Sequence, residues 1–339
     1  MENKEQVKLT ASELAALWSA YINDTMSLCF VQYFKEKNKD PQIAPAIEKA
    51  YHMSTTHLQK LRELYEKEEL PLPIGFGKED VNVDAEQLYS DMFALTFVEN
   101  MAKVGMVTYS AATGVSTRKD VRHYFMGGLQ ESAELFDLSS EIGLKTGLFV
   151  RAPFIPYPTQ VDFVDKKSYL SGYSMFNKQR PLNAIEISHL YMNIQTNLMG
   201  SRIALSFAQA SPTKEVQDFM LRGKDISEKH IKIFSDVMLE NGIQPPISSD
   251  ISITNSTVPP FSDKLMVFFM SLLSTAGVGN YAAAASASQR SDLVVNYERL
   301  SLEIGKYAKT GADLMIQNGY LEEPPGTVDK EKLVQTKKE

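Results

Sequence analysis

The chain repeats itself, and this internal duplication constrains the fold more than any other feature of the sequence. Moving the first part forward by 173 positions aligns it with a later part without a gap. The matched pairs include Leu9/Leu182, Glu13/Glu186, Ser54/Ser227, His57/His230 and Pro73/Pro246. A fixed offset sustained over so many positions is typical of a repeated structural unit.

From Ser90 onward the alignment continues at an offset of 172. The matched pairs here include Phe97/Phe269, Gly105/Gly277, Tyr109/Tyr281, Arg118/Arg290 and Glu131/Glu303. One deletion in a loop explains the change of offset. The sequence therefore predicts two copies of one unit of roughly 140 residues.

Each copy has the pattern of four helices. Thr10-Ala11-Ser12-Glu13 forms a capping box, and Asn183-Ala184-Ile185-Glu186 repeats it in the second copy. The apolar positions follow a helical period, and strand patterns are scarce. The predicted fold class is all-α, with helices in the first copy over residues 10–38, 41–69, 86–115 and 116–147.

The connections between the helices predict the topology. Short loops join the first helix to the second and the third to the fourth, which makes those pairs antiparallel. Roughly 17 residues join the second helix to the third, and when extended they reach on the order of 50 Å. That is long enough to run along the bundle, so we expect two tandem ferritin-like four-helix bundles, each with one long crossover loop.

The predicted organisation follows from these elements. A first four-helix bundle occupies residues 1–150, an irregular linker 151–181, a second bundle 182–326 and a disordered tail 327–339. The linker begins with Pro153, Pro156 and Pro158 and continues with an aromatic run of Phe163, Tyr169, Tyr173 and Phe176. Because a free linker would be poorer in aromatic residues, we expect this one to pack against the bundles.

Composition excludes some partners. The net charge is −7, with no basic patch in the sequence, so nucleic acid is not a predicted partner. The single cysteine, Cys29, lies in an apolar stretch and is expected to be a buried small side chain.

One segment has the length of a membrane span. Residues 265–289 carry no charge, but Gly277, Gly279 and Asn280 dilute their apolar character. We therefore expect a helix buried in the bundle and no membrane span. The predicted location is cytoplasmic.

A ferritin-like di-metal site needs two glutamates and two Glu-x-x-His motifs. This chain has Ser54-x-x-His57 and Ser227-x-x-His230, so serine replaces the carboxylate in both copies. On the fourth helix, Glu131 and Glu303 have no histidine three positions later. The ligand set of that site is incomplete.

Counting along the helices nevertheless places three repeated residues, His57, Gly105 and Glu131, at one level in mid-bundle, with Tyr109 one turn away. One hypothesis is a metal site for iron, manganese or zinc at His57 and Glu131, aided by Asp24 or Glu134, with a copy at His230 and Glu303. The alternative is a buried histidine–glutamate hydrogen bond that fixes the packing, with Gly105 allowing close helix approach. The interpretation as a hydrogen bond is favoured, since one imidazole and one carboxylate are too few ligands for most metals.

Other polar residues have simpler interpretations. Glu13 and Glu186 are predicted to cap the first helix of each copy, far from the mid-bundle level. Arg118 and Arg290 precede the fourth helices and are expected to be solvated or ion-paired. No phosphate loop or nucleophile motif is present, so no catalytic residue is predicted and the chain is not expected to be an enzyme.

Two stretches carry a family resemblance. They are RPLNAIEISHL at residues 180–190 and QNGYLEEPP at residues 317–325. They resemble a family of tandem ferritin-like four-helix-bundle proteins from spore-forming bacilli, sometimes labelled spore-coat-like. The resemblance implies two bundles and a cytoplasmic or spore-associated protein. It brings no catalytic residues with it.

The sequence therefore predicts a non-catalytic bundle with a structural or protein-interaction role, through protein partners or self-association, and with no cofactor. The alternative is a metal-binding, redox-type protein with a degenerate mid-bundle site. A third hypothesis is a small apolar ligand held between the helices.

Overall fold

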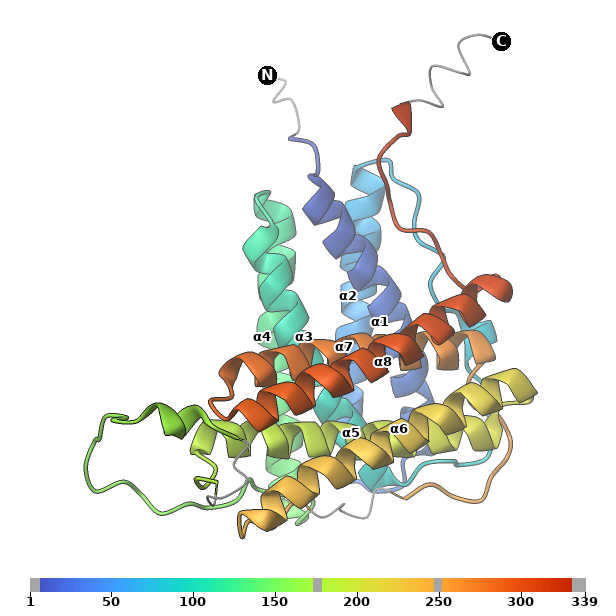
Figure 1. Cartoon of the computed structure of the whole chain (residues 1–339). Coiled ribbons are helices and arrows are strands. Elements are labelled where there is room, and N and C mark those ends of the chain that lie inside the picture. The colour runs from blue at the N-terminus through green and yellow to red at the C-terminus, as the bar shows by residue number, and fades with distance from the viewer. Residues whose placement is uncertain (1–6, 173–178, 247–251, 331–339) are drawn as a thin grey trace.

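Residues 7–172, 179–246 and 252–330 are described by the computed structural model, and they form eight α-helices in two groups of four. The first group is α1 (Ala11–Lys37), α2 (Ala44–Lys67), α3 (Asp91–Val115) and α4 (Lys119–Lys145). The second is α5 (Ala184–Ala210), α6 (Lys214–Glu240), α7 (Asp263–Ala287) and α8 (Ser291–Gln317). Two short 3-10 turns, η1 (Lys78–Asp80) and η2 (Lys167–Leu170), lie in the connections. Figure 1 shows α1–α4 upright and α5–α8 running across them. The all-helical, tandem-repeat prediction is confirmed.

Local sequence sets the helix starts in the same way in both halves. Thr10 and Asn183 form the predicted capping boxes at α1 and α5. Ser90 and Ser262 cap α3 and α7. The prediction that the third helix begins near residue 86 is therefore about one turn too early, because Ser90 is the N-cap and the residues before it are extended.

The long connection after α2 runs along α1, as predicted. Phe76 N–H donates to the hydroxyl of Thr25, the thiol of Cys29 donates to the carbonyl oxygen of Gly77, and Tyr33 OH donates to the carbonyl oxygen of Glu86. These α1 residues are spaced four apart, so the loop advances along one face of α1 toward its C-terminal end. α3 therefore starts at the same end of the bundle as α2.

Cys29 is buried, as predicted. Burial raises the pKa of its thiol to about 12, and the nearby charges of Asp80 and Glu79 add to the shift. The side chain is therefore an un-ionised thiol at neutral pH.

The two repeats share one aromatic core. Phe97 and its repeat equivalent Phe269 stack on each other, with ring centroids 5.5 Å apart. Phe30 of α1 contacts both Phe207 and Phe269 of the second repeat. A residue that touches its own equivalent lies near a local two-fold axis.

Backbone hydrogen bonds between the two crossover loops obey the same symmetry. Ser90 N–H donates to the carbonyl of Ser252, and Ser262 N–H donates to that of Asp80. Asn82 N–H donates to Pro260 and Thr254 N–H donates to Leu88. Each bond occurs twice with the repeats exchanged, so the repeats pack as a symmetric pair. The boundaries predicted for the individual bundles and the linker remain predictions.

The linker departs from the sequence prediction. Phe154, Tyr157 and Phe163 are exposed, and Tyr169 is half-buried beneath the guanidinium of Arg180, 4.1 Å from its ring centroid. The expectation that the aromatic run packs against the bundles is wrong for Phe163. Aromatic residues add apolar surface to a segment, but their number does not predict whether that surface is buried. The prolines of this linker restrict the backbone conformations that could turn the rings toward the bundles. Tyr173 and Phe176, and most of the predicted tail, lie outside the described residues.

One helix in the described part of the chain, α7, is long and apolar enough to cross a membrane by composition alone. Its buried side chains include Leu265, Met266 and Val267, which belong to the shared core. Core packing accounts for this apolar character.

Candidate functional site

The residues that counting placed at one level do meet in the first repeat. His57 of α2 is almost fully buried, at 1% exposure, and its Nε2 lies 2.5 Å from Oε2 of Glu131 on α4. The Glu131 side chain is 35% exposed, so one carboxylate oxygen is reachable from solvent. The predicted histidine–glutamate pair is therefore present.

The opposite side of the imidazole faces a second acidic group. His57 Nδ1 lies 2.8 Å from Tyr109 OH and 3.6 Å from Oδ1 of Asp24. Tyr109 OH in turn donates to Oδ2 of Asp24 at 3.2 Å, and Tyr124 OH donates to the same oxygen at 3.5 Å. We call Asp24, His57, Tyr109, Tyr124 and Glu131 the first polar layer.

Two carboxylates decide the charge of His57. Burial disfavours the imidazolium, but the hydrogen bonds and charges of Asp24 and Glu131 outweigh burial and raise the pKa of His57 to about 9. The hydrogen bond from His57 lowers the pKa of Glu131. His57 is thus a cation at neutral pH, with both ring N–H groups donating.

The second repeat has the same frame with two changed positions, because Asn197 stands at the place of Asp24 and Asn296 at that of Tyr124. His230 Nε2 lies 3.0 Å from Oε2 of Glu303, and its Nδ1 lies 2.9 Å from Tyr281 OH. Asn197, which stands where the first repeat has Asp24, donates its amide N–H to Tyr281 OH at 2.8 Å. We call Asn197, His230, Tyr281 and Glu303 the second polar layer.

His230 has the opposite electrostatics. Burial lowers its pKa, the charges of Lys229 and Arg299 add to this, and the bond to Glu303 does not compensate. The imidazole is therefore neutral at pH 7. Its Nε2–H donates to Glu303, and its Nδ1 accepts from Tyr281.

Gly105 allows close helix approach, as predicted. A Cβ atom added there would lie 2.5 Å from the hydroxyl oxygen of Ser132 on α4. At Gly277 the nearest atom to an added Cβ is Cδ1 of Ile304, at 3.4 Å. The glycine is needed for packing in the first repeat and much less in the second.

The additional metal ligands suggested by the sequence do not assemble together. Asp24 reaches the layer, but Glu134 pairs at the surface with Lys49, 2.9 Å away. Among the described residues no three His, Cys, Asp or Glu side chains group in a way that could hold a metal ion. Asp24 and Glu131 lie on opposite edges of the His57 ring and do not share a coordination centre with it.

Sequence reasoning missed part of the role of the capping glutamates. Glu13 Oε2 accepts from Thr10 N–H, while Oε1 accepts from the backbone N–H groups of Thr117 and Arg118, at 2.9 and 2.7 Å. One carboxylate thus joins the starts of α1 and α4. Burial opposes ionisation, but these backbone N–H groups lower the pKa of Glu13 to about 2.

The second repeat reproduces this junction. Glu186 accepts from Arg290 N–H at 3.0 Å and also pairs with Arg180 at 2.7 Å. Arg290 is 1% exposed and is held by Asp292, 2.7 Å away. The arginines are therefore ion-paired and buried, not solvated. The signal was available, since glutamate, arginine and aspartate recur in both copies.

Both repeats match one known protein family. Residues 1–161 and 171–333 each match the family described as "Protein of unknown function (DUF3231)". The chain belongs to this family. DUF3231 is thus present twice, in agreement with the two repeats and with the resemblance noted from sequence.

A solved structure is also similar. It is a Bacillus halodurans protein proposed to be a spore coat protein, 15% identical in sequence. The match covers 44% of this chain and 98% of that chain, with a TM-score of 0.42. Comparison with curated proteins gave no match.

Proposed function

We propose that this chain is a non-catalytic helical scaffold that acts by binding other proteins through its linker. The observation that carries the proposal is a run of exposed apolar side chains between α4 and α5. Phe154, Tyr157 and Phe163 are 84%, 89% and 96% exposed. Large apolar side chains that are exposed together in one segment are typical of protein interaction sites.

The linker has further features of a recognition segment. Ile155, Val161, Val164 and Leu170 add to its exposed apolar surface. Pro153, Pro156 and Pro158 stiffen the chain, which lowers the entropy lost when an extended segment is bound. The linker therefore offers apolar side chains for binding on a backbone whose conformations the prolines already restrict.

The first polar layer supports a role without catalysis. His57 is held as an imidazolium with both ring nitrogens donating, so it lacks the lone pair that a general base or a metal ligand needs. Both ring nitrogens of His57 are hydrogen-bonded to side chains of the same repeat. The first polar layer is therefore best understood as a packing device.

The test is a photo-crosslinking amino acid placed at Phe163, with Leu302 of α8, which is 70% exposed, as the matched control. We expect a discrete adduct, to a partner protein or a second copy, at Phe163 only. The purified partner should then bind the combined Phe154→Ser, Tyr157→Ser and Phe163→Ser variant at least tenfold more weakly. Equal crosslinking at both positions, or unchanged affinity of the variant, would refute the proposal.

Metal binding is a second candidate, and the second polar layer is the better place for it. His230 is neutral, and a cavity of about 60 Å³ adjoins Asn197 and Tyr281. The residues that line the cavity offer hydroxyl and amide oxygen atoms, including those of Ser227 and Ser274. Metal analysis of untagged protein is the test: stoichiometric iron, manganese or zinc that is lost in His230→Ala and Glu303→Ala would favour this candidate over the scaffold.

Cytoplasmic location, with spore association, is proposed from the sequence resemblance. Fractionation of the source cells before and after sporulation would test it. Recovery in a membrane fraction would contradict it.

A further inference from the structure

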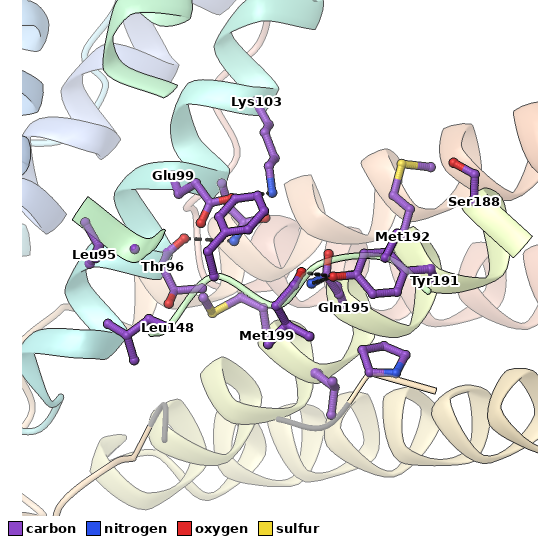
Figure 2. A pocket seen from close by; sticks show the side chains of 17 residues that line it. Leu95, Thr96, Glu99, Lys103, Leu148, Ser188, Tyr191, Met192, Gln195 and Met199 are labelled. Carbon is purple, nitrogen blue, oxygen red and sulfur yellow. Dashed lines mark hydrogen bonds and ion pairs between the residues drawn. The ribbon is translucent and has the colours of Figure 1, made fainter. Parts of the chain in front are cut away.

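A pocket at the junction of the two repeats is separate from both polar layers. It lies between α3 of the first repeat, α5 of the second and the segment 148–152 (Figure 2). Its volume is about 380 Å³. This is within the range of about 300–1,000 Å³ that small-molecule sites occupy.

The charges in the pocket cancel each other. Glu99 and Lys103, one helical turn apart on α3, form an ion pair at 2.6 Å. The Lys103 ammonium also lies over the ring of Phe136, 5.5 Å from its centroid. No net charge is thus presented to a ligand, and the rest of the wall is mainly apolar, including Leu95, Leu148, Phe149, Met192 and Met199.

The polar groups left over are acceptors. Gln195 donates an amide N–H to Tyr191 OH at 2.8 Å, and Tyr191 OH donates to the carbonyl oxygen of Val150. Asn100 donates an amide N–H to the carbonyl oxygen of Thr96 at 2.8 Å. Within the described part of the chain, the side-chain carbonyl oxygens of Asn100 and Gln195 accept no hydrogen bond. Both residues line the pocket, so these oxygens are acceptors that a ligand can use.

The fold itself does not require this polar lining. At the equivalent place in the other half, Thr96 and Asn100 are replaced by Phe268 and Leu272, and Tyr191 and Gln195 by Trp18 and Ile22. All four apolar residues pack against the shared core. Phe268 contacts Phe76 of the crossover loop, with centroids 5.1 Å apart. One half of a symmetric pair is therefore packed with apolar side chains, and the other holds a pocket with polar residues in its wall.

We propose that this pocket binds an uncharged amphipathic molecule that has an apolar body and a hydroxyl or N–H donor. The compensated Glu99–Lys103 pair disfavours ions. The apolar wall packs against the apolar body of the ligand. The amide oxygens of Asn100 and Gln195 accept a hydrogen bond from its hydroxyl or N–H group. Both acceptors would stay unpaired beside a ligand without a donor, which costs binding free energy.

The experiment uses the full chain and N-phenyl-1-naphthylamine, an uncharged fluorescent probe with one N–H donor. We expect saturable fluorescence enhancement in the wild type. Thr96→Phe, which copies Phe268 and fills the pocket, should weaken binding at least tenfold. Thr108→Phe, the same substitution at an exposed position of α3, is the matched control and should bind like the wild type.

Two further arms examine the donor and guard against misfolding. Gln195→Ile, which copies Ile22, should weaken binding about tenfold, the equivalent of one hydrogen bond. 1-Naphthol should displace the probe about tenfold better than 1-methoxynaphthalene, which has no donor. Far-UV circular dichroism verifies the fold of each variant. Absent saturation in the wild type, unchanged binding in both Thr96→Phe and Gln195→Ile, or equal displacement by the two naphthalenes would each overturn the proposal.

Discussion

The two polar layers are built on the same three residue types, yet one holds a charged imidazole and the other a neutral one. The decisive difference is Asp24 in the first repeat against Asn197 in the second, at the far side of an equivalent tyrosine. Neighbouring charges reinforce it, because Lys229 and Arg299 act on His230. A shared fold therefore fixes where the histidine sits, while the charged groups around it set its protonation.

The largest expected effect is on stability when the histidine is removed. His57→Leu leaves Asp24 buried without its cation, which should lower the free energy of unfolding by about 3–5 kcal/mol. His230→Leu leaves Glu303 still paired with Lys229, 2.8 Å away, and should cost about 1–2 kcal/mol. Urea denaturation of both variants measures the difference. Equal losses would mean that the two layers are energetically alike.

The pH dependence of stability should differ in the same sense. The pKa of His57 is raised to about 9 in the folded chain, against about 6.5 when unfolded. Its contribution is complete below pH 6.5 and is lost as the pH rises to 9, by about 3 kcal/mol in total. The pKa of His230 is lowered, so its contribution is present above pH 6.5 and falls away at lower pH.

Urea unfolding between pH 6 and 9.5 would reveal the His57 contribution, with His57→Leu as the reference. The wild type should lose stability over this window, and the variant should lose much less. Parallel curves would contradict a charged His57.

Exchanging the residue at position 24 or 197 should shift the pKa of the neighbouring histidine toward that of its repeat equivalent. Asp24→Asn should lower the pKa of His57 toward that of His230 and cost about 1–3 kcal/mol of stability. Asn197→Asp should raise the pKa of His230. NMR titration of the two imidazole rings measures both shifts. If the pKa of His57 stays near 9 in Asp24→Asn, Glu131 alone sets the charge.

The smallest effect concerns the mid-bundle glycines. Gly277→Ala should stabilise the chain by about 1 kcal/mol, because alanine is the better helix former and space is available. Gly105→Ala should gain less or lose stability, since Ser132 must move. Thermal unfolding of the two variants compares them directly, and a larger gain at Gly105 would show that Ser132 yields freely.

Much of the frame was predictable because it follows local rules. Capping residues and loop lengths gave the helices and the crossover, and counting residues brought His57 and Glu131 to one level. The charge of His57 was not predictable in this way, since it depends on how α1 is rotated to bring Asp24 to the ring. The second role of Glu13, at the start of α4, likewise arises between elements more than 100 residues apart in sequence.

The exposed linker and the shared core were harder still. Apolar composition favours burial, but it does not name the surface that would bury Phe163. The match of Phe97 with Phe269 is visible in the aligned repeats, yet alignment alone does not say that equivalent residues touch. Both features depend on how the repeats and the linker pack against one another. The periodicity of a single sequence predicts helices, but it does not predict this packing.

The exchanged hydrogen bonds between the crossover loops make the two repeats a two-fold symmetric pair within one chain. Assembly of such a pair is independent of protein concentration, because the partner is always tethered. In an unlinked homodimer, a substitution at position 24 would appear in both subunits, and both layers would change together. Joining the halves in one chain frees each to vary alone, which permits one cationic and one neutral layer, and one filled and one open junction, in the same molecule.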